Sequence, residues 1–499
     1  MRNDRISRRQ FTLAAAGLGA APMLMAAAQG FDTIISGGRV MDPESGFDGI
    51  ANVGIRNGKI AAITAAPLAG GKRIDARGLV VAPGFIDLHS HGRTLGDADL
   101  QAQDGVTTSL ELEAGTYPVA AFLAAREGRA RINYGASSGQ RAVRIFMTTG
   151  LPTPNFATLS PEIMRREQEW AYTRFDAPRI ARMAEIIRGE IDSGSLGIGL
   201  MNEYVPGASR AESMALFRVA AATRGPIFAH VRRSIAADGD GPMAPMEEVI
   251  AMAAATGGPL HICHIGSKAH DAIDDVLALI HGTAARGIDI TTEVYPYTAG
   301  STLIGSALFD KGWQERIGAN YSDLEWPPTG ERMTQASFER YRQELPNTAI
   351  IIHNISQRTV DVAMADPAVM VASDAIAFVN GKGHPRGAGT FARTLGVYVR
   401  ERKVLGLMEA LKKMTLMPAK RLEAVAPAMR NKGRVKVGAD ADLTLFDPAT
   451  VIDRATFATP SVPSAGIPYV MVGGILVVHH GGSIADAFPG KAVRAGPRA

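Results

Sequence analysis

The chain has very little cysteine and very little net charge. Cys263 is the single cysteine among 499 residues, so no intrachain disulfide can form. The formal net charge is +4, and four arginines against one aspartate before residue 29 supply three of these charges. The rest of the chain is nearly neutral, which argues against nucleic acid as a partner.

The composition excludes a disordered chain. Apolar residues make up 46% and charged residues 20%, and this length can bury one large core and a smaller one. No internal repeat or low-complexity segment is evident beyond an alanine-rich stretch near the amino terminus. We therefore expect a large globular domain with an accessory domain.

Residues 1–28 have the pattern of a targeting segment. The stretch Ser7-Arg8-Arg9-Gln10-Phe11 precedes an apolar run rich in alanine and glycine, which ends in three alanines at 26–28. A transmembrane anchor is the weaker interpretation, because the run is only modestly apolar and closes with small residues. The pattern resembles a twin-arginine signal peptide. It predicts the twin-arginine export machinery as a partner, contact with the membrane only during export, and a periplasmic protein.

Two short segments at the ends of the chain have similar patterns. Residues 29–82 and 426–499 both contain short apolar strands separated by glycine-rich turns. We expect the two segments to pair into one small β-sandwich domain, with the last residues as a tail.

Residues 83–425 alternate apolar strands of four to six residues with longer amphipathic stretches. This alternation predicts an α/β fold with a parallel sheet, which at this length closes into a (β/α)8 TIM-like barrel. Barrels of this kind place their chemistry at the carboxyl ends of the strands. Polar residues that end apolar runs are therefore the candidates for a functional site.

The strongest local signal is an apolar strand that ends in His89-Ser90-His91. Alternate residues of a strand point the same way, so both imidazoles can face the barrel mouth and bind one metal ion. A His-x-His pair alone is weak evidence, but the preceding strand and Asp87 strengthen it.

Two further histidines end apolar strands in the same way. His230 closes 226–229 and His264 closes 260–263. Singly, each is more often a structural histidine than a ligand. Four histidines on three predicted strand ends of one barrel indicate a metal site.

Asp374 ends the late strand 370–373 and supplies a carboxylate. A metal-dependent hydrolase needs such a group to take a proton from the attacking water and pass it to the leaving nitrogen. The alternative is an aspartate that caps a helix. Cys263 is not expected to be a nucleophile, because neighbours on a strand face opposite sides and it should point between barrel and helices.

These residues, in this order, resemble the amidohydrolase superfamily and, more narrowly, the D-aminoacylase (N-acyl-D-amino-acid deacylase) family. Supporting stretches lie at 204–207, 228–232, 295–302 and 384–391. Together with the split β domain they span nearly the whole mature chain. The resemblance implies metal-dependent hydrolysis of a linear amide bond in an N-acyl-(D-)amino acid.

The resemblance also implies a role for each metal-site residue. His89 and His91 bind the weaker or second metal, His230 and His264 bind the tight one, and Asp374 is the general acid/base. Histidine and carboxylate ligands suit one or two zinc ions, and manganese, cobalt or nickel are also compatible.

In that family, a tyrosine, a serine and an arginine bind the carboxylate of the substrate, and their motifs match Tyr295, Ser301 and Arg386. An arginine suits this task because its guanidinium offers two parallel hydrogen bonds to a carboxylate. For Tyr295, the alternative is a purely structural aromatic turn.

The chain departs from the family in three places. The stretch after Gly105-Val106-Thr107-Thr108 lacks the metal-binding cysteine, and 196–203 contains no lysine that could be carboxylated. We expect Glu113 to be the bridging ligand, with Glu111 as the alternative on the same strand face; either could instead orient a histidine. The substrate-binding lysine of the family lies two residues after the histidine, whereas Lys268 lies four residues after His264. Glu293 stands where the family usually has aspartate.

Other functions remain open at this point. A cyclic-amide or dipeptide hydrolase, of the hydantoinase or isoaspartyl-dipeptidase type, would share the histidines and the aspartate, although 295–302 and 384–391 argue against it. A non-catalytic periplasmic binding protein is the alternative outside enzymes. We also expect the segment 310–346 to lie near the barrel mouth and to influence the choice of acyl group.

Overall fold

The computed structural model describes residues 30–91, 94–153, 159–232 and 241–497. The predicted signal peptide therefore lies outside the described residues. Within them, no helix combines the length and the apolar character needed to cross a membrane.

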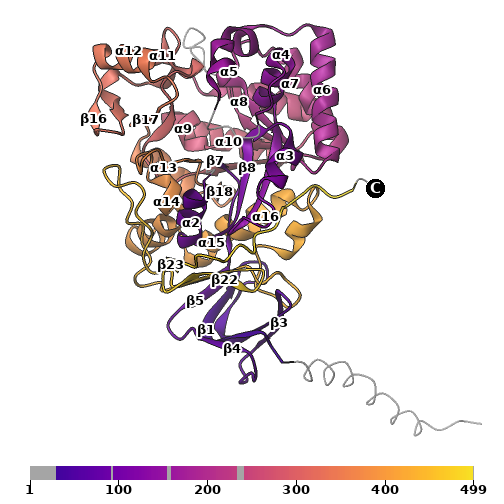
Figure 1. Cartoon of the computed structure of the whole chain (residues 1–499), viewed down its shortest axis with the longest axis vertical. Coiled ribbons are helices and arrows are strands. Elements are labelled where there is room, and N and C mark those ends of the chain that lie inside the picture. The colour runs from indigo at the N-terminus through magenta and orange to yellow at the C-terminus, as the bar shows by residue number, and fades with distance from the viewer. Residues whose placement is uncertain (1–29, 92–93, 154–158, 233–240, 498–499) are drawn as a thin grey trace, which may run out of the picture.

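Eight parallel strands form the centre of the molecule (Figure 1). In sheet order they are β6 (Phe85–Asp87), β8 (Val106–Thr116), β9 (Asn133–Gly139), β10 (Ile198–Met201), β11 (Ile227–His230), β12 (Leu260–Ile262), β13 (Ile290–Val294) and β18 (Val369–Val371). The first and last of these strands are joined beyond their ends, where β7 (Ser90–His91) pairs in parallel with β19 (Ala375–Ile376). The strands therefore close into a barrel.

Helices cover the outside of the barrel. They are α2 (Leu95–Gln103), α3 (Val119–Ala124), α4 (Gln140–Thr149), α5 (Pro161–Arg165), α6 (Ala177–Asp192), α7 (Arg210–Thr223), α8 (Met243–Thr256), α9 (Ile265–Ala269), α10 (Ile273–Ala284), α13 (Gln357–Ala365), α14 (Arg386–Arg393), α15 (Leu407–Leu411) and α16 (Met417–Leu422).

Helix α6 illustrates why these segments are helical. The Asp176 side chain accepts from the Arg179 amide at its start, and the helix buries Met183, Ile187 and Ile191 at four-residue spacing. A capped start and one apolar face are what a surface helix needs to pack on a sheet.

The chain between β13 and β18 builds a separate small unit on the barrel. Strands β14 (Gly300–Leu303), β15 (Leu324–Trp326), β16 (Glu331–Arg332) and β17 (Ala349–Ile352) form an antiparallel sheet, accompanied by α11 (Trp313–Ile317) and α12 (Gln335–Glu344). Aromatic side chains such as Phe309, Trp313 and Phe338 form its core. Figure 1 shows this unit in orange, beside the barrel and far from the amino-terminal strands.

Strands from both ends of the chain form a nine-stranded sheet, where antiparallel pairing of β5 with β20 joins the two ends. The strands are β1 (Thr33–Asp42), β2 (Phe47–Arg56), β3 (Lys59–Thr64), β4 (Lys72–Asp75), β5 (Val80–Pro83), β20 (Leu443–Phe446), β21 (Tyr469–Val472), β22 (Ile475–His479) and β23 (Gly482–Ser483). In Figure 1 these indigo and yellow strands meet below the barrel. The predicted fold class, a barrel with a β domain from both ends, is confirmed. The exact domain boundaries stay a prediction.

Candidate metal centre

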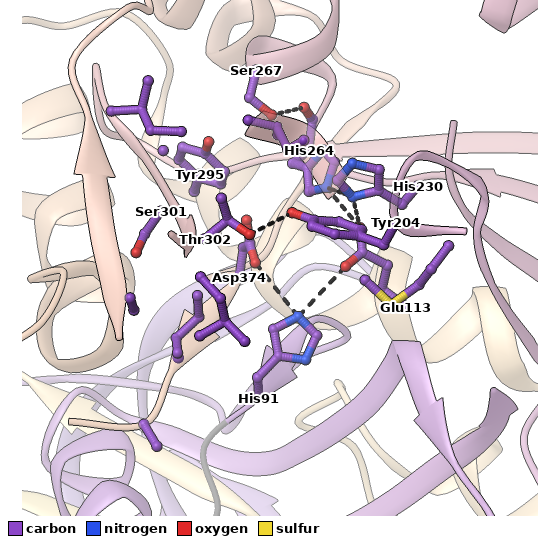
Figure 2. A pocket seen from close by; sticks show the side chains of 18 of the residues that line it. His91, Glu113, Tyr204, His230, His264, Ser267, Tyr295, Ser301, Thr302 and Asp374 are labelled. Carbon is purple, nitrogen blue, oxygen red and sulfur yellow. Dashed lines mark hydrogen bonds and ion pairs between the residues drawn. The ribbon is translucent and has the colours of Figure 1, made fainter. Parts of the chain in front are cut away.

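A cavity of about 260 Å³ opens at the carboxyl ends of the barrel strands and brings the predicted residues together. His91, Glu113, His230, His264 and Asp374 all line it. Figure 2 shows Glu113, His230 and His264 on one side of this cavity and Tyr295 and Ser301 on the other, with Asp374 between them.

Glu113, His230 and His264 form the first group of potential ligands. Glu113 Oε1 lies 2.8 Å from His230 Nδ1 and 2.6 Å from His264 Nε2, and these two ring nitrogens are 3.0 Å apart. All three residues are buried.

His89 and His91 form a second group around the other oxygen of the same carboxylate. Glu113 Oε2 lies 3.2 Å from His89 Nε2 and 3.5 Å from His91 Nε2. Asp374 Oδ1 lies 3.2 Å and 3.6 Å from the same two nitrogens. Glu113 is thus shared by the two groups.

Each histidine ring has an inner nitrogen, which faces Glu113, and an outer nitrogen, which points away from it. In three of the four histidines the outer nitrogen contacts a glutamate, and each of the three has its own. Glu293 Oε1 lies 2.5 Å from His89 Nδ1, Glu111 Oε1 lies 2.8 Å from His91 Nδ1, and Glu203 Oε2 lies 2.7 Å from His230 Nε2. An ionised carboxylate only accepts hydrogen bonds, so each of these outer nitrogens carries the hydrogen. When the imidazole is neutral, as a metal ligand must be, its inner nitrogen then presents a lone pair.

Lone pairs and carboxylate oxygens that converge in a buried space repel one another unless a cation lies among them. Although burial opposes ionisation of Glu113, the attraction of His89, His230 and His264 holds its pKa well below the ordinary value. Histidine and carboxylate donors are the set that zinc and similar divalent ions prefer. The residues present fit a site for one or two such ions.

The two candidate glutamates of β8 do not share a cavity. Glu113 lines the cavity described above, whereas Glu111 lines a second one next to α2 and α3. The pairing of β8 with β9 shifts register between Glu111 and Thr116, which breaks the simple alternation of faces. The expectation that both glutamates lie on one strand face is therefore wrong.

The expected orientation of Cys263 is also wrong. Its side chain packs with barrel-interior residues such as Leu112 and Phe228, and its sulfur lies within 4.8 Å of ligand atoms of His89 and Glu293. Alternation directs Cys263 inward, and His264 reaches the mouth because its backbone leaves the strand conformation with a φ of 36°. Burial raises the pKa of the Cys263 thiol well above its ordinary value, which opposes a role as nucleophile.

The position of the Asp374 side chain depends on a similar backbone turn and on the contacts of Asp87 with the preceding residue. Asp374 has a φ of 50°, just after the end of β18. The buried Asp87 carboxylate accepts from the Ser373 hydroxyl at 2.5 Å and from the Ser373 amide at 3.0 Å. Burial raises the pKa of Asp87 to about 6. Asp87 thus fixes the residue before Asp374 rather than joining the ligand groups.

Tyr295, Ser301 and Arg386 lie together beside Asp374. Tyr295 and Ser301 line the cavity, and the Arg386 guanidinium lies 4.8 Å from the centre of the Tyr295 ring. Arg386 Nη1 is 2.9 Å from Asp374 Oδ2, and Nη2 is 3.5 Å from the carbonyl oxygen of Ser301. The arginine side chain is fully buried, and burial raises the pKa of the Tyr295 hydroxyl to about 12.

Lys268 also lines the cavity, but its ammonium group donates to Glu203 Oε2. Burial would raise the pKa of Glu203, yet attraction to Lys268 and His230 holds that pKa far below its ordinary value. Lys268 therefore belongs to an ion pair whose other member contacts His230.

The sequence did not identify Glu203 or the role of Glu293. Glu203 lies two residues after the end of β10, and Glu293 lies within β13 one residue before its end. Glu293 also lies 3.2 Å from His261 Nε2, one layer deeper in the barrel. Both follow the rule that acids near barrel strand ends belong to the site.

The chain matches the model of the amidohydrolase family over residues 72–319 and 355–478. It is 30% identical over 474 residues to an N-acyl-D-glutamate deacylase of Alcaligenes xylosoxydans xylosoxydans, covering 89% of this chain and 93% of that protein. It is 28% identical over 494 residues to a D-aminoacylase of the same organism, covering 89% and 94%.

A crystal structure of N-acyl-D-glutamate deacylase from Bordetella bronchiseptica, complexed with zinc and a phosphonate inhibitor, superimposes with a TM-score of 0.77. It is 27% identical, and the match covers 94% of this chain and all of that one. With the convergent histidines and carboxylates, these matches exclude a non-catalytic binding protein. The chain therefore belongs to the amidohydrolase family and is a metal-dependent hydrolase of carbon–nitrogen bonds.

Proposed function

We propose that this enzyme removes the acyl group from N-acyl amino acids, most of all those of the D series, by hydrolysing their linear amide bond. The observation that supports this proposal is the buried Arg386 beside Tyr295 and Asp374. Its Nη1 forms the ion pair with Asp374, whereas its Nε makes no hydrogen bond with the residues that the structure describes. A buried guanidinium with an unused Nε donor, next to the ligand groups, suits the carboxylate of an amino acid whose amide lies over the metal centre.

The ligands in this proposal are His230 and His264 for one ion and His89 and His91 for the other, with Glu113 between the two groups. A divalent ion bound there polarises the amide carbonyl and makes water a better nucleophile. Glu111, Glu203 and Glu293 keep the hydrogens on the outer histidine nitrogens, so that the inner nitrogens stay available.

Asp374 is the proposed general acid/base. Among the described residues that line the cavity, the carboxylates are Glu113 and Asp374. Histidines surround both oxygens of Glu113, whereas one oxygen of Asp374 faces His89 and the other faces Arg386. Asp374 can therefore accept the proton of the attacking water and deliver it to the leaving nitrogen.

The matched proteins support the substrate class and the metal. The relatives are named for N-acyl-D-glutamate and D-amino-acid derivatives, and the Bordetella bronchiseptica enzyme binds zinc. We accordingly propose zinc as the ion and the D series as the preferred substrates.

The test measures metal per protomer and the release of free amino acid from paired N-acetyl-D- and N-acetyl-L-amino acids. We expect one or two zinc ions and release from the D series. Bound metal without release from either series would reject the substrate class. Absence of bound metal after reconstitution with zinc would reject the ligand assignment.

The amino-terminal sequence supports a proposal on location. We propose that Arg8 and Arg9 direct export through the twin-arginine route to the periplasm. Fractionation of cells that produce the full chain should place the wild type in the periplasm and the Arg8→Lys/Arg9→Lys variant in the cytoplasm. Equal distribution of both proteins would contradict this route.

A further inference from the structure

Lys268 stands out among the residues of the main cavity. Among the described residues, Lys268 is the only lysine or arginine that lines this cavity. A lysine at this place would normally attract a negatively charged substrate group. Its charge decides which side chains the substrate can have.

Glu203 neutralises this charge. The Lys268 ammonium donates to Glu203 Oε2, and the exposed fractions of the two side chains are 14% and 3%. Glu203 is also held by His230 Nε2 at 2.7 Å. An acidic substrate group would have to displace a buried carboxylate that has a second partner, and it would meet the negative charge of that carboxylate nearby.

The remaining walls offer apolar contacts. Leu303, Leu308, Ile317 and Ile352 from the small antiparallel unit line the cavity, together with Met201 and Phe378. The polar side chains that this unit and the chain next to it contribute to the cavity are those of Ser301, Thr302, Asn347 and Asn354, which are uncharged. An aliphatic or aromatic group gains free energy when it leaves water for such a surface, whereas a carboxylate loses it.

We infer that Glu203 sets the substrate preference of this enzyme, so that N-acyl amino acids with neutral, apolar side chains are hydrolysed and those with acidic side chains are disfavoured. The inference rests on the proposed function. The preferred substrates of this enzyme would then differ from the substrate in the name of the N-acyl-D-glutamate deacylase that the chain resembles.

The experiment compares kcat/KM of the zinc-loaded full chain for N-acetylmethionine and N-acetylglutamate, in whichever configuration is hydrolysed. The wild type should favour methionine by at least about tenfold. In Glu203→Gln, the ratio should shift toward glutamate by about tenfold or more, because Lys268 becomes available. The double variant Glu203→Gln/Lys268→Met should lose that shift.

Glu248→Gln is the matched control, because it removes a buried carboxylate paired with Arg232 that does not line the main cavity. Its preference should equal that of the wild type. Ile317→Lys provides a second test. It adds a cation without a partner to the apolar wall and leaves the contact between Glu203 and His230 unchanged. It should also shift the ratio toward glutamate by about tenfold.

The possible failures are distinguishable. If neither compound is hydrolysed in either configuration, the proposed function is wrong and this inference with it. If the wild type hydrolyses the glutamate compound as well as the methionine compound, only the preference is wrong. If Glu203→Gln keeps its zinc and its preference while Ile317→Lys shifts, Glu203 does not set the preference.

Discussion

Glu293 Oε1 lies 2.5 Å from Nδ1 of His89, and both side chains are almost completely buried. The same glutamate lies 3.2 Å from His261 through its other oxygen. The carboxylate thus fixes the ring of a proposed ligand from behind, and its position within a barrel strand makes this arrangement rigid.

We expect Glu293→Ala to weaken metal binding by about 10–100-fold, because His89 loses the partner that fixes its ring and its hydrogen. Titration of the metal-free protein against a chelator of known affinity measures this change. Glu325→Gln is the control, since Glu325 also contacts a histidine, His353 at 2.9 Å, in the small antiparallel unit. Unchanged affinity in Glu293→Ala would contradict an orienting role.

The two glutamates of β8 should differ in their effect on metal content. Glu113→Ala should bind less than one ion per protomer, because the ligand groups on both sides lose their shared carboxylate. Glu111→Ala should keep bound metal at an affinity reduced by about 10–100-fold, because only the orientation of His91 changes. Elemental analysis after dialysis measures both. The reverse order would make Glu111 the ligand.

Asp374→Asn should lower kcat by about 10²–10⁴-fold while the protein retains at least one metal ion. The amide cannot accept the proton of the attacking water, but the group of Glu113, His230 and His264 stays intact. Asp176→Asn makes the same chemical change at the exposed start of α6, where asparagine also caps a helix, and should keep full activity. Retention of kcat in Asp374→Asn would remove this residue from the chemistry.

Arg386→Met should raise KM for N-acyl amino acids by about 10–100-fold, which corresponds to the loss of a charge-assisted hydrogen bond of about 1.5–3 kcal/mol. Because Arg386 also contacts Asp374, the comparison needs a second substrate whose carboxylate is replaced by a carboxamide. The variant and the wild type should differ much less on that analogue. An equal loss on both substrates would assign Arg386 to Asp374 alone.

The sequence predicted the barrel and most of the metal centre because the signals are local. His89 and His230 follow an apolar run directly, His91 and Asp374 lie within three residues of one, and the chemistry of a barrel lies where such runs end. The prediction needed only the strand positions and the residue types.

The errors lie where a backbone dihedral or a register shift decides the outcome. The positive φ of His264 lets its ring reach the mouth although the preceding Cys263 already faces inward, and the irregular pairing of β8 separates Glu111 from Glu113. His264 gives no sequence signal for its positive φ, because it is not a glycine, and Gly115 in the irregular stretch of β8 does not by itself reveal the change of register. The pair of Glu203 and Lys268 joins residues 65 positions apart on different elements, so only the folded chain brings them together.

Stability should depend on one buried ion pair that does not line the main cavity. Arg144 in α4 lies 2.5 Å from Glu212 in α7 through Nη1, and both side chains are inaccessible to solvent. Arg144→Met leaves the Glu212 carboxylate buried without its cation, so the free energy of unfolding should fall by about 3–5 kcal/mol. Urea denaturation of the zinc-loaded protein measures the change.

The double variant Arg144→Met/Glu212→Gln should recover much of this loss, because no isolated charge stays buried. Arg182→Met serves as the control, since Arg182 pairs with Glu185 on the exposed face of α6 and both side chains are about two-thirds exposed. That variant should change the free energy of unfolding by less than about 1 kcal/mol. A similar loss in Arg182→Met and Arg144→Met would show that burial of the pair is not what makes Arg144 important.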